Sequence, residues 1–363
     1  MFIVTNRNIK NENGTDFSAV EDVCNRKGPA ELRILEVTKK GRSWTLRVLK
    51  DKATDAMLAE VEIAKPDNGE PVYASRYAFG KIVAAAMADP KNPRPIVFYV
   101  HGFNNTLEDV VVRCDALSKT FGVEVVAFSW PANGGGVRGV ASYLDDKRDA
   151  LASVVAFDRA LQKARDLLQD LRASAIEAIA VKSNEKFPKN GERFRELLAR
   201  EAEKHCPIRT TLMLHSMGNY LLERTLKSTA LRGHCPLFDN IALCAADVNH
   251  EDHAAWLDQL QPRSRLYVTI NEDDVALRAS RLKGGDEQLA RLGHWTSNLN
   301  SSQAIYVDFT NAKRVGTSHA YFDGVALENS KVKNFFKAAL HGLRAEQEVS
   351  LAYDSARNLY RIP

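Results

Sequence analysis

The pattern of hydrophobic and polar positions changes character near residue 90. Before that point, apolar residues alternate with polar ones over residues 44–48 and again over residues 57–63. A period of two is typical of half-buried antiparallel strands. An alanine-rich helical pattern then runs from Tyr73 to Ala88 and stops at Asp89-Pro90. Residues 1–90 are therefore predicted to form antiparallel strands followed by a helix.

Beyond residue 90, short and mostly unbroken apolar runs are separated by helical stretches. Unbroken runs are expected when both faces of a parallel sheet are covered. The predicted strands are Ile96–Val100, Val123–Ser129, Thr211–Leu214, Ile241–Ala245, Leu266–Ile270 and Ala304–Phe309. Together the patterns predict an α/β fold over residues 1–363: a three-layer sandwich with a mostly parallel sheet, antiparallel N-terminal strands and one domain.

The interval over residues 142–206 is too long for one crossover between strands. Its apolar spacing predicts a crossover helix, then a polar stretch and a second helix. This helical insertion is either a lid over the functional site or a hairpin away from it. The charged tail after Leu343 is predicted to be partly loose.

Composition excludes several classes of function. The chain is 45% apolar and 26% charged, as in ordinary globular proteins. Its net charge of +4 gives no case for nucleic acid or an anionic membrane as a partner. The five cysteines are widely spaced without a C-x-x-C pair, so neither a disulfide framework nor a metal site is expected. With no signal-like opening and no apolar run of about 18 residues, a cytoplasmic location without a transmembrane segment is the expectation. The sequence leaves the oligomeric state open.

The strongest chemical signal is a serine between a strand and a helix. The apolar run Leu212–Leu214 breaks into His215-Ser216-Met217-Gly218-Asn219 and then becomes amphipathic and helical. Such a turn lifts a serine hydroxyl above the sheet, and the helix N-terminus behind it offers N–H groups to an oxyanion. The alternative is a serine that only caps the helix.

A serine nucleophile requires a histidine base and a carboxylate that orients it. Asp274 follows the predicted strand 266–270, and His319 follows the predicted strand 304–309. The order Ser216, Asp274, His319 is the one used in α/β-hydrolases. Asp273 and Asp247 are the alternative acids, and His294 is the nearest rival as the base.

Donors for the oxyanion can be assigned by position. Met217 follows the serine, and Phe103 follows the pair His101-Gly102 at the end of the strand 96–100. His101, Asn104, Trp130 and His215 are predicted to border the pocket, although Trp130 suits core packing equally well. The segment Gly134–Gly139 matches G-x-G-x-x-G, but its context favours a loop beside the pocket over a dinucleotide site.

Five ordered motifs carry a resemblance that spans nearly the whole chain. They are HGFNNT from His101, FSWPANG from Phe128, LHSMGN from Leu214, DDVAL from Asp273 and SHAYF from Ser318. With the opening segment Phe2–Arg7, they resemble a bacterial α/β-hydrolase family of unknown function. The resemblance implies the α/β-hydrolase fold and a Ser–Asp–His triad, without a substrate. Leu214 departs from the pattern, because glycine or alanine is typical two residues before the serine.

The expected activity is that of a serine esterase acting on a small-molecule acyl substrate without a cofactor. Thioesterase, lipase and amidase activities share the same machinery. A non-catalytic binding or scaffold protein that keeps the fold is the alternative from a different class.

Overall fold

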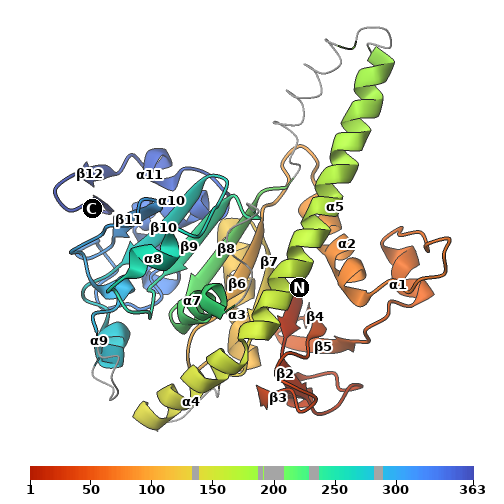
Figure 1. The fold of residues 1–363 in the computed structure, drawn as a ribbon, viewed down its shortest axis with the longest axis horizontal. Helices are drawn as coiled ribbons and strands as arrows, with labels where there is room; N and C mark the ends of the chain where they lie inside the picture. The colour runs from red at the N-terminus through yellow and green to blue at the C-terminus, as the bar shows by residue number, and fades with distance from the viewer. Residues whose placement is uncertain (133–138, 187–190, 192–207, 229–236, 282–288) are drawn as a thin grey trace.

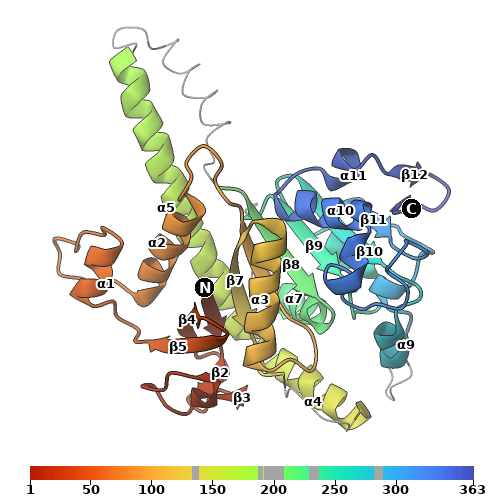
Figure 2. The ribbon, with the colours of Figure 1, turned by 180° about the vertical axis from the view of Figure 1, so that it is seen from behind.

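A large, mostly parallel β-sheet forms the centre of the molecule, with helices on both faces (Figures 1 and 2). The computed structural model describes residues 1–132, 139–186, 191, 208–228, 237–281 and 289–363. Within these residues the sheet has eleven strands in the order β12-β13-β11-β10-β9-β8-β6-β7-β1-β4-β5. Their bounds are β1 Phe2–Thr5, β4 Arg33–Lys40, β5 Ser43–Leu49, β6 Ile96–Val100, β7 Glu124–Ser129, β8 Thr210–His215, β9 Asn240–Cys244, β10 Arg265–Ile270, β11 Ala304–Asp308, β12 Ala352–Asp354 and β13 Leu359–Arg361.

The six strands predicted from unbroken apolar runs correspond to β6 through β11, and the predicted α/β fold is confirmed. All neighbouring pairs among these strands are parallel. Parallel strands need a crossover between them, so helices cover both faces and each strand is apolar on both sides. Two large core clusters lie on opposite faces of the sheet, one around Val97 and Tyr99, the other around Val100 and Leu212.

The helices fall into two layers. α3 and α10 lie on one face, and α5, α7 and α8 lie on the other (Figures 1 and 2). Their bounds, with the smaller elements, are α1 Asp55–Glu60, α2 Ala74–Ala86, α3 Leu107–Phe121, α4 Gly139–Ala152, α5 Val154–Lys186, α7 Met217–Ser228, α8 His253–Leu257, α9 Val275–Arg281, α10 Ser330–Leu340, α11 Ala345–Glu348, η1 Phe17–Ala19, η2 Leu292–His294, η3 Gly324–Glu328, β2 Arg7–Ile9 and β3 Val20–Cys24.

The N-terminal region joins the parallel sheet through β1. This strand pairs in parallel with β7 on one side and antiparallel with β4 on the other, and β4 and β5 form a hairpin. The alternating pattern over residues 44–48 is β5. The strand predicted over residues 57–63 is wrong: the chain forms α1 there. The Thr54 hydroxyl accepts the Met57 N–H and caps a short helix that buries Met57 and Leu58.

Of the predicted insertion over residues 142–206, the described part is helical. α4 and α5 follow one another with a break at Ser153, and α5 extends beyond the edge of the sheet (Figure 1). The Asn6 amide donates to the Ser153 hydroxyl at 2.9 Å, which connects the break to the residue between β1 and β2. The second predicted helix lies largely outside the described residues, so the choice between lid and hairpin stays a prediction.

The prediction of a loose tail after Leu343 is wrong. The tail forms α11, β12 and β13, and β13 pairs in parallel with β11. Leu351, Leu359 and Ile362 are buried against the body. Strands of three residues carry too few apolar positions to show a period in the sequence.

In the part of the chain that the structure describes, no helix is both long and apolar enough to cross a bilayer.

Candidate active site

Ser216 stands on a sharp turn at the carboxyl edge of the sheet. β8 ends at His215 and α7 begins at Met217, so one residue connects the strand to the helix. Ser216 has a φ of +53°. This left-handed conformation costs a side chain about 1–2 kcal/mol and persists only when the surroundings impose it.

Two glycines allow the turn to pack closely against the loop after β6. A Cβ on Gly218 would lie 2.8 Å from the His101 carbonyl oxygen. A Cβ on Gly102 would lie 2.6 Å from the Ser216 Cβ. Leu214 fits without displacing either segment: it is fully buried, in register with Val100 of β6. The bulky residue two positions before the serine therefore does not prevent the turn from forming.

The side chain of Asn219 stabilises the turn through hydrogen bonds to backbone carbonyls. Its side-chain amide donates to the carbonyl oxygens of Ser216 at 2.9 Å and Cys244 at 3.3 Å. The Ser216 N–H also donates to the Cys244 carbonyl at 3.0 Å. A single buried side chain thus fixes the backbone of the turn against β9.

The Asn219→Ala variant should lose about 1–3 kcal/mol of unfolding free energy, because buried carbonyls lose their donor. The reactivity of Ser216 should also decrease in this variant, because the backbone of the turn is no longer fixed by hydrogen bonds from Asn219. Chemical denaturation and the rate of labelling by a serine-directed probe measure the two effects. Asn219→Asp keeps the shape without the donors, so wild-type behaviour of that variant would contradict the role of the amide.

His319 is paired with a fully buried carboxylate. Its Nδ1 donates to Asp274 Oδ2 at 2.7 Å. The other oxygen of Asp274 accepts the N–H groups of Ala276 at 2.9 Å and Leu277 at 3.0 Å at the start of α9. Asp274 therefore caps α9 with one oxygen and orients the imidazole with the other.

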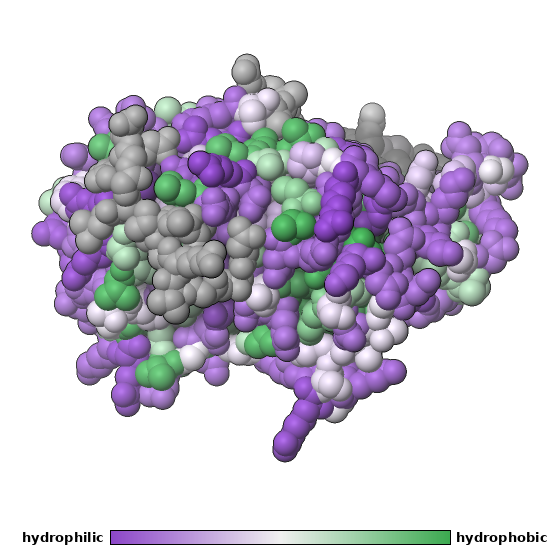
Figure 3. Space-filling model, turned by 90° about the horizontal axis from the view of Figure 1, so that it is seen from below, coloured by the Kyte–Doolittle hydropathy of each residue, from purple (hydrophilic) through white to green (hydrophobic). Residues whose placement is uncertain are grey.

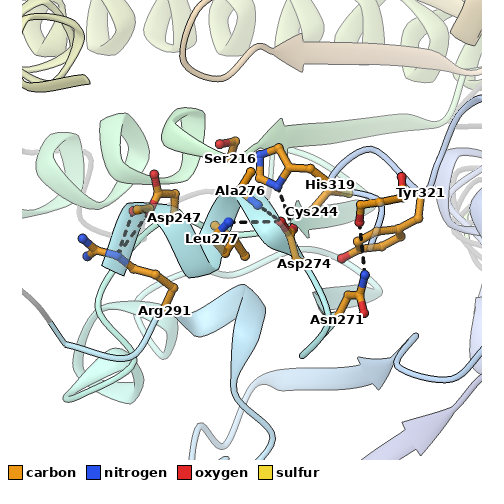
Figure 4. Close-up of polar contacts among 12 residues, drawn as sticks. Ser216, Cys244, Asp247, Asn271, Asp274, Ala276, Leu277, Arg291, His319 and Tyr321 are labelled. Atoms are coloured by element: carbon orange, nitrogen blue, oxygen red, sulfur yellow. Dashed lines mark hydrogen bonds and ion pairs between the residues drawn. The ribbon is translucent and has the colours of Figure 1, made fainter. Parts of the chain in front are cut away.

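The imidazole of His319 lies between Asp274 and Ser216 (Figure 4). Because Nδ1 donates to the carboxylate, Nε2 remains an acceptor, and this nitrogen lies on the side of Ser216. No hydrogen bond joins the Ser216 hydroxyl to His319 within the described residues. Such bonds are often long in unliganded enzymes and tighten when substrate binds.

The alternative acids lie elsewhere. Asp247 accepts hydrogen bonds from the hydroxyls of Ser280 at 2.6 Å and Tyr143 at 3.0 Å, and it forms a buried ion pair with Arg291 at 3.2 Å. Asp273, which directly precedes Asp274, is half-buried and forms no hydrogen bond to His319. The geometry favours Asp274 as the partner of the histidine.

Burial beside Asp247 raises the pKa of Tyr143, so its hydroxyl stays protonated and donates.

The two candidate oxyanion donors belong to segments that meet at Ser216. Met217 is the first residue of α7, where backbone N–H groups lack partners within the helix. Phe103 lies in the loop that packs on Ser216. The Phe103 carbonyl accepts from the Asn105 amide at 2.6 Å, and the Asn104 N–H donates to the buried Asp146 at 2.9 Å. These bonds fix the peptide planes of the loop.

Arg7, the first residue of β2, supports this loop. The fully buried guanidinium donates to the carbonyl oxygens of Asn105 at 2.8 Å and Ala132 at 3.3 Å, and it pairs with Asp22. Burial lowers the pKa of Arg7 to about 10, which leaves it charged at pH 7. Arg7 thus connects the loops that follow β6 and β7.

The other predicted pocket residues occupy different places. His101 and Trp130 are fully buried and stacked, with ring centroids 5.1 Å apart, as side chains packed in the core are. His215 is also buried, and its Nε2 donates to the His319 carbonyl at 3.0 Å. Asn104 is exposed at the edge of the site, with a φ of +58°. Of the segment Gly134–Gly139, residues 134–138 lie outside the described residues.

Burial, together with nearby Arg7, lowers the pKa of His101 to about 3. The unfolded chain binds this proton near pH 6.5, but the folded protein does not until about pH 3. Folding stability should therefore fall as the pH decreases from 6.5 towards 3, by roughly 1 kcal/mol per pH unit from this residue. The unfolding free energy of His101→Gln, measured at pH 7 and pH 5, should depend less on pH than that of the wild type. If His101→Gln has the same pH dependence of stability as the wild type, His101 is not the residue responsible.

Ser216, Asp274 and His319 lie at the edge of the sheet where the parallel strands end. α4 and α9, which follow β7 and β10, both lie at the bottom of Figure 1. Viewed from below, the surface is mostly hydrophilic, with hydrophobic residues in several small patches (Figure 3). Within the described ranges, no three His, Cys, Asp or Glu side chains lie together as a metal site.

Comparison with known proteins identifies one family model that matches the chain. It is described as an alpha/beta hydrolase of unknown function (DUF900), and it matches residues 81–180 and 172–334. A search of curated proteins found no match.

Proposed function

Because the chain belongs to this α/β-hydrolase family of unknown function, we propose that it is a serine hydrolase of carboxylic esters. The resemblance of its motifs predicted the family. The observation that carries the proposal is the alignment of Asp274, His319 and Ser216, with the serine in a left-handed conformation at the head of α7. A buried carboxylate on one side of an imidazole and a serine on the other is the arrangement that acyl transfer requires.

In the proposed reaction, the Ser216 oxygen attacks the ester carbonyl while its proton passes to Nε2 of His319. The Phe103 and Met217 N–H groups donate to the oxyanion. His319 then gives the proton to the departing alcohol oxygen as the ester C–O bond breaks. Water, deprotonated by His319, attacks the acyl-enzyme and releases the acid, and the proton returns to Ser216. Asp274 holds the tautomer of His319 throughout.

Asn219, Asp146 and Arg7 are positioning residues in this proposal. Each binds backbone atoms of the two segments that carry the nucleophile and the oxyanion donors. Sequence reasoning did not identify them, because their role depends on which carbonyl or N–H lies within reach.

A non-catalytic binding protein is the second candidate. The observation that favours it is the low exposure of Ser216, which is 4% accessible. Thioesterase, lipase and amidase activities use the same proposed residues and differ in the substrate.

The decisive experiment is labelling of the folded protein with a fluorophosphonate probe, followed by peptide mapping. An activated serine should be labelled at Ser216 in native protein and not after heat denaturation. Native protein that resists labelling would favour the binding protein. Rates on matched p-nitrophenyl esters, thioesters and anilides of one acid then separate the enzyme classes, and the ester should be the best substrate.

A further inference from the structure

A hollow lies away from the candidate active site. Its volume is about 480 Å³, and it opens between α2, α5 and the strands β1, β4, β6 and β7. This is within the range of about 300–1,000 Å³ found for small-molecule sites. Large apolar side chains that remain partly exposed line it: Val4, Ile34, Phe79, Ile82 and Phe98.

The exposure of Phe98 is unusual for its position. β6 lies inside the sheet between β7 and β8, where helices normally cover both faces. Interiors are otherwise filled to the density of organic crystals. Here three separate core clusters, which include Phe2, Val126 and Phe157, border the hollow without filling it. The hollow is therefore an apolar cavity between these three clusters.

The rim of the hollow is positively charged. It carries four basic residues and two acidic ones: Arg33, Lys50, Arg159 and Lys163 against Glu31 and Asp51. Arg33 lies 3.3 Å from Glu31 and 3.7 Å from Asp51, so it engages both acids. Among the described residues, Lys50, Arg159 and Lys163 form no ion pair with a carboxylate. Arg159 donates to the Ala30 carbonyl oxygen at 2.6 Å, and Lys50 and Lys163 are exposed.

We propose that this hollow binds a medium-chain fatty acid, with the alkyl chain among the apolar side chains and the carboxylate at the basic rim. An unbranched chain suits an interior whose sheet-side walls are apolar. The exposed ammonium groups of Lys50 and Lys163 complement an anionic head group. None of Ser216, Asp274, His319, Phe103 and Met217 lines the hollow. The proposal therefore goes beyond the serine hydrolase function and does not depend on it.

The test uses the full chain and a fluorescent fatty acid, 11-(dansylamino)undecanoic acid, displaced by saturated acids of eight, ten and twelve carbons. Each added pair of methylenes should tighten binding about tenfold, as expected for burial of alkyl groups. Dodecanol, which lacks the carboxylate, should bind more weakly than dodecanoic acid. Failure of the folded wild type to bind the probe, or equal affinity for the acid and the alcohol, would overturn the proposal.

Variants locate the site. Ala160, on α5, lines the hollow and is only partly buried, so Ala160→Trp should fill it and reduce affinity at least tenfold. Lys163→Glu reverses a rim charge on the exposed side of the same helix and should weaken binding several-fold without a change in folding. Arg165→Glu is the matched control, because Arg165 lies on α5 but does not line the hollow.

Binding by Ser216→Ala separates this inference from the proposed function. Wild-type affinity of that variant supports a separate site, whether or not Ser216 is reactive. Loss of binding in Ser216→Ala, or wild-type binding by both Ala160→Trp and Lys163→Glu, would place the ligand elsewhere and refute the proposal.

Discussion

Replacing Ser216 with alanine should abolish ester hydrolysis, with kcat lower by about 10⁶-fold, as when the nucleophile of other serine hydrolases is removed. The alanine removes the only group that can form the proposed acyl-enzyme. His319 and Asp274 remain paired in the variant, so the fold should be kept. The measurement is kcat on the best p-nitrophenyl ester, with the melting temperature recorded for the same preparation.

The glycine variant at this position is the matched control. Ser216→Gly also removes the hydroxyl and should be equally inactive. Because glycine accepts a φ of +53° without a Cβ clash, Ser216→Gly should be about 1 kcal/mol more stable than Ser216→Ala. Substantial turnover by either variant would refute Ser216 as the nucleophile.

Asp274→Asn should lower kcat by about 10⁴-fold while leaving substrate binding little changed. An asparagine amide facing Nδ1 favours the wrong tautomer of His319, so Nε2 can no longer accept the serine proton. The side-chain oxygen of asparagine can still accept the N–H groups of Ala276 and Leu277, so α9 keeps its cap. The kcat and KM values of purified variant and wild type provide the measurement.

Asp273→Asn and Asp247→Asn are the controls for this assignment. Asp273→Asn should retain near wild-type turnover, because that residue makes no hydrogen bond to His319. Asp247→Asn should instead lower stability, since it leaves Arg291 without its buried charge partner. A kcat loss larger for Asp247→Asn than for Asp274→Asn, at equal folded fraction, would show that the acid was assigned wrongly.

The central strands could be predicted from the sequence because both of their faces are buried. Strands β6 to β11 are covered on both faces, so each is an apolar run that stands out from its flanking helices. The turn at Ser216 could be predicted because strand, serine, glycine and helix are contiguous in the sequence. Asp274 and His319 could be proposed from their positions after β10 and β11.

The errors have physical causes too. The alternation over residues 57–63 imitates a strand, but Thr54 caps a helix there and the buried pair is Met57 and Leu58. The strands of the tail are three residues long, too short for a period to be visible. Asn219, Asp146 and Arg7 each bind a backbone atom that lies 25 or more residues away in sequence, in Cys244, Asn104 and Asn105 respectively. No residue pattern encodes which carbonyl or N–H they meet.

The place of β1 in the sheet has a consequence for protein synthesis. β1 can pair with β4, and β4 with β5, as soon as those strands leave the ribosome, but the other edge of β1 pairs Phe2 with Val126 of β7. Until β7 emerges, the nascent β1–β4–β5 unit has an open edge of unpaired N–H and carbonyl groups. Open edges of this kind promote association with other chains. The interval of translation between β5 and β7 is therefore when this protein should depend most on chaperones.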